Sequence, residues 1–169
     1  MTKRIGPLLF DVALLVVSVM SCDRPQDMTF DIVHNPCEPL VVVPAEGSTL
    51  AERGNLAQAV ELWNQAVSAQ LTLDDLPDAP RLPVRFEDGA LAIYGVYEDE
   101  EGKVLINRRL GGLAQVVTIA HELGHSFGLY HVAKSQRLSV MNKGNLVVAP
   151  NAGDVSDVRA IWGDCREGS

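Results

Sequence analysis

The pattern of apolar and polar positions predicts several strands between the N-terminal region and the middle of the chain. Short apolar runs that are bounded by glycine, proline or acidic residues are typical of strands. Such runs lie at residues 40–44, 82–86, 91–97 and 103–107. The last two flank an acidic turn at 98–102, so we expect them to form a hairpin.

Apolar residues that recur every three or four positions predict two long helices. Ser48 or Thr49 can cap the first, whose apolar stripe continues to about residue 70. The second covers residues 113–127 and follows two glycines. We interpret both apolar stripes as core, because an amphipathic helix buries its apolar face in a globular domain.

A short third helix completes the predicted set of elements. Ser156 is its expected cap and Gly163 its expected end. The order of elements predicts an α+β fold with about four to five strands, two long helices and a short C-terminal helix.

Length and charge restrict the classes of partner. The chain has 169 residues and a formal net charge of −8, which fits one domain with a substantial core. Nucleic-acid binding needs basic residues against the phosphates, so an acidic chain is a poor candidate for it. We expect a monomer without a nucleic-acid partner.

Three of the four histidines lie in one stretch, His-Glu-Leu-Gly-His-Ser-Phe-Gly-Leu-Tyr-His, at residues 121–131. His121 and His125 are four positions apart and therefore share one helix face, where both imidazoles can reach a single metal ion. Gly128 allows the helix to end, because glycine adopts the left-handed conformation without steric cost. The turn can return His131 as a third ligand, and three nitrogens with an open fourth position are typical of a catalytic zinc.

Glu122 is the candidate catalytic residue of this stretch. It follows His121 and lies about 100° further around the helix, so it is placed to take a proton from water rather than to bind the metal. A metal site that only holds the fold would need no carboxylate there. The fourth histidine, His34, lies far from the stretch, and we interpret it as incidental.

The stretch resembles the zinc signature of the metzincin clan of metallopeptidases and is most similar to the matrixin branch. Ser139-Val140-Met141-Asn142 resembles the methionine turn of the clan, and residues 156–163 resemble the final helix of that branch. The resemblance implies a small metzincin-like zincin domain with a mixed twisted sheet and one catalytic Zn²⁺, and Met141 in support of the site. Two residues depart from it: Val132 fits no particular family, and Lys143 stands where some families place a tyrosine.

The N-terminus has the pattern of a secretory signal. Lys3 and Arg4 precede an apolar stretch that ends before Cys22. The sequence Val-Met-Ser-Cys resembles a bacterial lipobox, in which Cys22 carries the lipid, although Asp11 interrupts the apolar stretch. We expect a lipoprotein signal at 1–21, a tether at 22–39, a catalytic domain at 40–169 and a lipid anchor in the bacterial cell envelope. The alternatives are an ordinary signal with a secreted or periplasmic product, or a buried N-terminal helix.

Cys37 and Cys165 remain once Cys22 carries lipid, and an even pair in an exported protein favours a disulfide. Such a bridge would join the two ends of the domain. Two other interpretations stay open for Cys37 at this stage: an unpaired thiol or an inhibitory zinc ligand.

These observations predict a zinc-dependent endopeptidase that uses zinc-activated water and Glu122 as general base. In the metzincin fold the strand at 91–97 would lie at the sheet edge above the zinc, where an extended peptide can be added as one more strand. One alternative is a zinc hydrolase of another amide, such as a cell-wall cross-link. Another is a non-catalytic, metal-dependent binding lipoprotein.

The acidic turn at 98–102 could bind calcium, but a solvated turn is favoured because it lacks the alternating oxygen spacing of a calcium loop.

Overall fold

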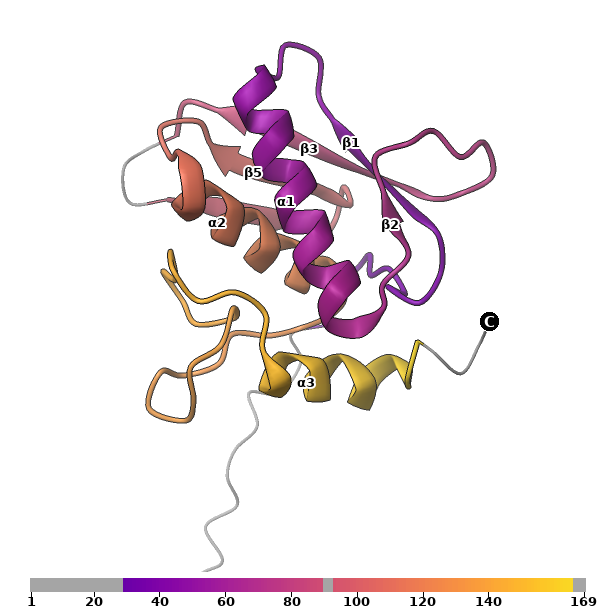
Figure 1. Ribbon diagram of the computed structural model, residues 1–169, viewed down its shortest axis with the longest axis vertical. Coiled ribbons are helices and arrows are strands. Elements are labelled where there is room, and N and C mark those ends of the chain that lie inside the picture. The colour runs from indigo at the N-terminus through magenta and orange to yellow at the C-terminus, as the bar shows by residue number, and fades with distance from the viewer. Residues whose placement is uncertain (1–28, 90–92, 166–169) are drawn as a thin grey trace, which may run out of the picture.

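The computed structural model describes residues 29–89 and 93–165. Its helices and strands follow one another as β1 (Leu40–Pro44), α1 (Leu50–Val67), β2 (Leu71–Thr72), β3 (Arg81–Glu87), β4 (Gly95–Glu98), β5 (Lys103–Asn107), α2 (Gly112–Ser126) and α3 (Ala152–Trp162). The predicted α+β class, with a mixed sheet and two long helices, is confirmed (Figure 1).

The sheet has five strands in the order β2-β1-β3-β5-β4. β1 pairs in parallel with β2 and β3, and β3 pairs in parallel with β5, whereas β4 is antiparallel to β5. The predicted hairpin of β4 and β5 is therefore present, and β4 lies at the edge of the sheet. β2 was not predicted, because Leu71 and Thr72 form a strand only through their pairing with β1.

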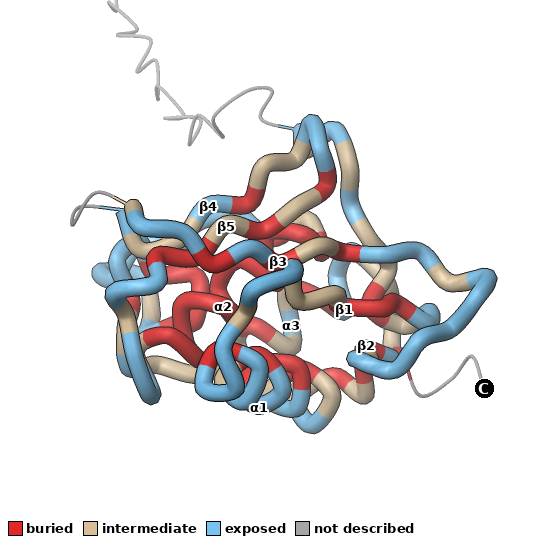
Figure 2. Tube along the Cα trace, turned by 90° about the horizontal axis from the view of Figure 1, so that it is seen from above, coloured by how far each residue is buried: buried red, intermediate tan, exposed pale blue. Residues whose placement is uncertain are grey.

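The core lies between one face of the sheet and the helices α1 and α2 (Figure 2). Trp63 of α1 is fully buried and contacts Phe127 edge to face, with ring centroids 5.3 Å apart. Its indole Nε1–H donates to the carbonyl oxygen of Ala120 at 2.8 Å, so the polar atom of this large side chain is satisfied. Burying such side chains contributes about 1.5–3 kcal/mol each, and here it fixes α2 against α1.

The first helix begins where the sequence predicts and ends earlier. Thr49, rather than Ser48, is the cap: its hydroxyl accepts from the Glu52 N–H at 3.2 Å, and the Glu52 carboxylate accepts from the Thr49 N–H at 2.7 Å. The helix ends at Val67 because Ser68 has a φ of 58°, in the left-handed region. The apolar stripe continues past this point, but residues beyond it leave the helix to form β2.

The start of the last helix was predicted wrongly. Asn151, not Ser156, caps α3: its side-chain oxygen accepts from the Gly153 N–H at 2.9 Å, while Asp154 accepts from the Asn151 N–H at 3.0 Å. Both residue types are strong caps, and the reciprocal bonds to Asp154 favour Asn151. The expected end of the helix at Gly163 is confirmed.

Residues 29–36, which we call the N-terminal strap, pack against the domain. The Tyr97 hydroxyl donates to the Ile32 carbonyl at 2.7 Å, and the His34 N–H donates to the Ser126 carbonyl at 2.7 Å. A disulfide between Cys37 and Cys165 then joins the residue after the strap to the segment after α3, as the cysteine pairing predicts. This part of the predicted tether is thus fixed to the domain, whereas Cys22 and the predicted signal lie outside the described residues.

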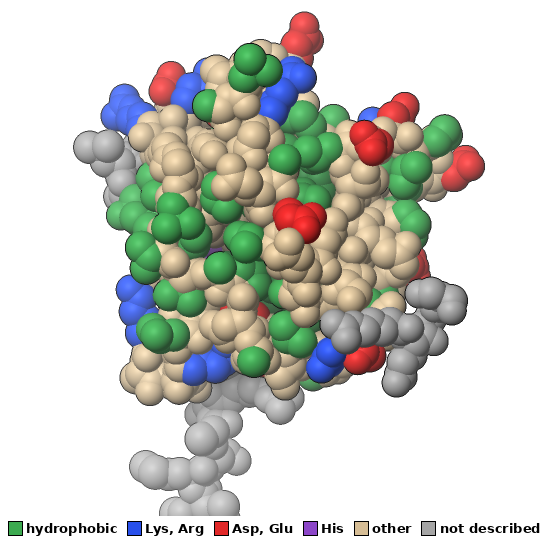
Figure 3. All heavy atoms as spheres, viewed as in Figure 1, with side chains coloured by type: hydrophobic (Ala, Val, Ile, Leu, Met, Phe, Trp, Pro, Cys, Tyr) green, Lys and Arg blue, Asp and Glu red, His purple; other side chains and the backbone are tan. Residues whose placement is uncertain are grey.

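Charged side chains of both signs are interspersed over the face drawn in Figure 3, without a patch of one sign. Within residues 29–89 and 93–165, no helix has the length and apolar character that crossing a membrane requires.

Candidate metal centre and catalytic site

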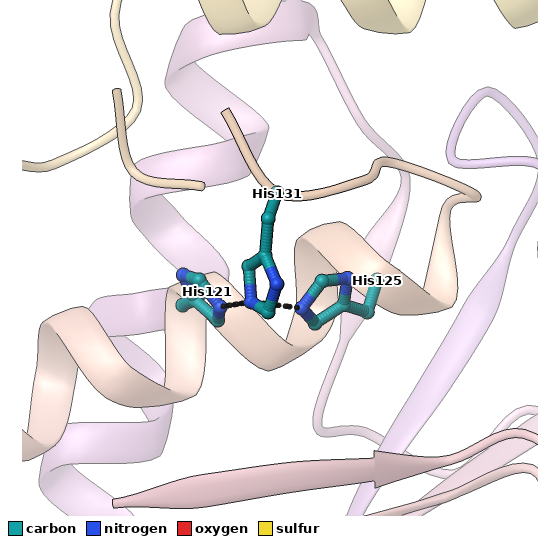
Figure 4. A group of neighbouring side chains, drawn as sticks. All are labelled: His121, His125 and His131. Carbon is teal, nitrogen blue, oxygen red and sulfur yellow. Dashed lines mark hydrogen bonds between the residues drawn. The ribbon is translucent and has the colours of Figure 1, made fainter. Parts of the chain in front are cut away.

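Two elements bring the three predicted histidines together. His121 and His125 project from the same side of α2, and His131 approaches them from the loop that follows the helix (Figure 4). Gly128 has a φ of 87°, the left-handed conformation that the sequence predicts there. The Gly128 N–H donates to the His125 carbonyl at 2.9 Å, so the helix ends and the chain turns back toward its own side chains.

Backbone carbonyls fix the orientation of two of the imidazole rings. His121 Nδ1 lies 2.7 Å from the Val140 oxygen, and His125 Nδ1 lies 2.7 Å from the Leu129 oxygen. A carbonyl oxygen can only accept, so each Nδ1 carries the hydrogen. Each Nε2 therefore keeps its lone pair free for a metal, the arrangement that metal-bound histidines usually have.

The geometry of the three rings fits a zinc ion. His131 Nε2 lies 3.1 Å from His121 Nε2 and 3.3 Å from His125 Nε2, close to the roughly 3.3 Å expected between nitrogens bound tetrahedrally at about 2.0–2.1 Å. The ligand atoms of all three residues lie within 4.8 Å of one another. Three neutral imidazoles that face one point form a donor set suited to zinc.

The methionine turn, residues 139–142, packs against the helix that carries His121 and His125. Met141 is fully buried, and a Cβ added to Gly124 would collide with its Sδ, so the loop packs directly beneath α2 between the two helical histidines. The fully buried Asp154 of α3 accepts from the Ser139 hydroxyl and, at 3.1 Å, from the Val140 N–H. The same peptide segment offers the Val140 carbonyl to His121, so α3 holds the loop that orients this ring.

Glu122 lies beside the histidines under the edge strand. Its side chain is only 5% exposed, and a Cβ added to Gly95 of β4 would lie 2.8 Å from both its Cγ and its Oε1. Glycine at this position therefore makes room for the carboxyl group between β4 and α2. Thr118, one turn earlier on α2, faces the same position, since that added Cβ would lie 2.9 Å from its Cγ2.

Burial shifts the protonation equilibria of the site toward neutral forms. Desolvation raises the pKa of Glu122 to about 8, against a lowering contribution from the Tyr97 backbone. Desolvation, together with the neighbouring His121, lowers the pKa of His125 to about 3. The pKa values of His121 and His131 are also lowered, chiefly by burial, and for His131 additionally by the charge of Lys143. The imidazoles thus remain unprotonated, as metal ligands must be.

The metal-free protein should lose stability relative to its Glu122→Gln variant as the pH rises from 6.5 to 8. The histidines of the site act in the opposite direction near pH 6.5, because they are neutral in the folded chain but still half protonated in the unfolded chain. This contribution is the same in the parent and in Glu122→Gln. The Glu122 carboxyl, with a pKa raised from 4.5 to about 8, stays protonated only in the folded state. At this group the folded state binds the additional proton, so the contribution of Glu122 to the free energy of unfolding falls with pH, by about 2 kcal/mol over this window.

Urea unfolding in the presence of a chelator, at several pH values between 6.5 and 8, measures this slope. The slope should be more positive in Glu122→Gln, because glutamine does not titrate and the contribution of the histidines remains. An equal slope in both proteins would show that Glu122 is ionised when the metal is absent.

A cleft of about 470 Å³ opens over these residues. Its walls are α2 and the edge strand β4, with the loop at Lys143, Gly144 and Asn145 at one side. Lys143 is the only lysine or arginine among the described residues that line it, and its side chain is exposed. Cys37 does not line the cleft and is disulfide-bonded, which excludes its interpretation as an inhibitory zinc ligand.

Comparison with known proteins agrees with a metallopeptidase fold. The model of the reprolysin-like family M12B of metallo-peptidases matches residues 64–132, which include α2 and all three histidines. The disintegrin and metalloproteinase domain-containing protein 12 of Mus musculus is 27% identical, over 56% of this chain. The chain spans 14% of that relative's length.

A solved structure shares the fold. High choriolytic enzyme 1, a hatching enzyme zinc-protease from Oryzias latipes, superposes with a TM-score of 0.50 at 12% identity, and the match covers 79% of this chain and 94% of that chain. The family match supports the predicted resemblance to the metzincin clan. It does not support the predicted matrixin branch, because the matched family is M12B. The eleven-residue motif is common to the clan and therefore does not separate its branches.

Several residues of the site lie outside what the motif predicts. The carbonyls of Val140 and Leu129 act through the backbone and leave no signal in the side-chain sequence. Gly95 carries a weak signal, as a glycine inside an apolar strand pattern often marks a close approach. Phe30 lies in the N-terminal strap, and nothing in its local sequence connects it with the cleft that it lines.

Proposed function

We propose that the protein is a zinc-dependent endopeptidase. The observation that carries the proposal is the convergence of three imidazole Nε2 atoms and one buried carboxyl at the floor of an open cleft. His121, His125 and His131 would hold the ion, and the metallopeptidase match over residues 64–132 supports the same assignment. When bound, zinc acts as a Lewis acid toward a carbonyl oxygen and lowers the pKa of water.

Glu122 is the residue that moves the proton in this proposal. Its carboxylate accepts a proton from the water that attacks the carbonyl carbon, and the protonated acid then donates it to the leaving amine. The low exposure of the side chain keeps bulk water away, and the close approach of Gly95 leaves room for the carboxyl group where it lines the cleft. Burial raises the pKa of this carboxyl in the metal-free site, which favours return of the proton to the leaving amine.

The edge strand favours a peptide as the substrate. β4 pairs with β5 on one side, and on its other side no strand of the described chain pairs with it. Such an edge can bind an extended chain through main-chain hydrogen bonds, with side chains pointing alternately toward and away from the sheet. A peptide bound in this way would cross the cleft above the three histidines, with residues on both sides of the scissile bond. This geometry is that of an endopeptidase.

A peptide-library cleavage assay on the purified protein, combined with elemental analysis, tests the proposal. The expected result is one zinc per chain and internal cleavage of peptides. A protein that holds zinc but cuts no peptide in a broad library would contradict the endopeptidase and leave the hydrolase of another amide or the binding lipoprotein. Release of product from cell-wall fragments separates these two.

We also propose that the chain is exported and anchored through a lipid on Cys22. The basic and apolar segment before Val-Met-Ser-Cys supports this location, as does the disulfide between Cys37 and Cys165, since disulfides persist in oxidising compartments. Cys22→Ser should move the protein from the membrane fraction to the soluble fraction of bacterial cells that express the full chain. Unchanged partitioning would reject the anchor, and Ser21→Ala, which keeps the cysteine, is the matched control.

A further inference from the structure

We propose that Phe30 of the N-terminal strap forms one wall of the substrate cleft and selects a large apolar side chain of the substrate on the His125 side. The inference rests on the proposed peptidase function and adds a specificity determinant to it. Phe30 lies outside the segment that the metallopeptidase family matches, residues 64–132. It nevertheless lines the same cleft as the three histidines and Glu122.

Phe30 is the centre of an aromatic cluster at one end of the cleft. Its ring stacks on that of Tyr130, with centroids 4.9 Å apart and an angle of 16° between the planes. It meets the ring of Tyr97 edge to face at 6.0 Å and approaches the His125 ring to 5.6 Å. A candidate metal ligand and an apolar wall are therefore adjacent at this end.

The strap holds Phe30 in place without a substrate. Immediately after Phe30, the Asp31 N–H donates to the Asp99 carboxylate at 3.1 Å, and the Ile32 carbonyl accepts from the Tyr97 hydroxyl at 2.7 Å. Further along, the His34 N–H is bonded to the Ser126 carbonyl at 2.7 Å. Because the wall is fixed before binding, a substrate side chain that contacts it does not bear the entropic cost of ordering it.

The two ends of the cleft differ in chemistry. Phe30 lies beside Tyr97, whereas the loop that contributes Lys143 and Asn145 lies near Tyr94, since a Cβ added to Gly144 would lie 4.0 Å from the Tyr94 Cε2. An extended peptide along β4 would direct alternate side chains into the cleft, so one of them would meet the aromatic wall beside His125. Differences of one or a few methylenes in an apolar pocket change kcat/KM by about 10–200-fold. We therefore expect the aromatic wall to select the side chain at a single position of the substrate.

Phe30→Ala tests the proposal with peptides that differ at one position at a time. The parent should prefer leucine or phenylalanine over alanine or glycine at one position near the scissile bond. In Phe30→Ala, kcat/KM for the large apolar peptides should fall at least about 10-fold, mainly through KM, while the alanine and glycine peptides change less than about 3-fold. Phe30→Leu should restore part of the preference. Val33→Ala, which removes an exposed apolar residue of the same strap, is the matched control and should behave like the parent.

Three outcomes would overturn the proposal: an unchanged preference in Phe30→Ala, an equal loss for every peptide, or a gain for every peptide. The second would indicate a structural role, and the third an occluding strap. Zinc content and thermal unfolding of each variant identify a folding defect. Calorimetric binding of the same uncut peptides to Glu122→Gln, with and without Phe30→Ala, gives a readout without turnover. If the parent cuts no peptide, the proposed function fails, but this binding comparison still decides the role of Phe30.

Discussion

Glu122→Gln is expected to reduce kcat for peptide cleavage by at least about 10²–10⁴-fold, the usual cost of losing a general base. Glutamine has nearly the same volume and can still hydrogen-bond water, but it cannot accept a proton at neutral pH. The buried position between Gly95 and Thr118 is filled equally well by the amide. Zinc content should therefore equal that of the parent. The activity would then be lost because proton transfer is lost, and not because the metal is lost.

The measurement is steady-state cleavage of one peptide by zinc-loaded parent and variant, with elemental analysis of the same samples. Glu61→Gln is a matched control, because it makes the same chemical change at an exposed position of α1. Cleavage by Glu122→Gln at the parental rate would show that another group moves the proton. A variant that loses its zinc would instead place Glu122 among the groups that hold the metal centre together.

His125→Ala is expected to abolish stoichiometric zinc binding and, with it, peptide cleavage. His125 supplies one of three converging Nε2 atoms, and its ring is oriented by the Leu129 carbonyl. Loss of an outer hydrogen-bond partner of a metal ligand costs about 10–100-fold in affinity or activity, so loss of the ligand itself should cost at least about 100-fold. His121→Ala and His131→Ala should have the same effect.

Elemental analysis after dialysis against a competing chelator gives the zinc content of each protein. The parent should retain one zinc per chain, and His34→Ala is the matched control. His34 lies in the strap, and its Nε2 is buried without a hydrogen-bond partner in the described structure, so removing this imidazole should leave the metal centre intact. Equal zinc in the parent and in His125→Ala would reject the three-histidine assignment.

Local periodicity was sufficient to predict the elements that form the site. The spacing of His121 and His125 places both on one helix face, and Gly128 adopts the positive φ that the return of His131 requires. The hairpin of β4 and β5 was predicted because the two strands flank one short turn. These features depend on interactions between residues close together in the chain, which the sequence displays directly.

Two predictions failed where nearby residues offer alternative starts or ends for the same helix. Ser156 is a good cap by residue type, but Asn151 makes reciprocal bonds with Asp154, and Asp154 is further held by the Ser139 hydroxyl and the Val140 N–H. The tertiary contact thus strengthens one of two possible helix starts. In the same way, pairing with β1 draws Leu71 into the sheet, so α1 ends sooner than its apolar stripe.

The residues of the proposed site could be predicted from sequence alone: three histidines spaced for one metal ion, one carboxyl beside them, and a pair of cysteines near the two ends of the domain. The orientation, pKa values and surroundings of these groups follow from the packing of the folded chain. The orienting carbonyls of Val140 and Leu129, the space for Glu122 beside Gly95, and the position of Phe30 against His125 join segments far apart in the chain. Such contacts arise from packing, and the residues that make them carry no local pattern that would reveal their partners.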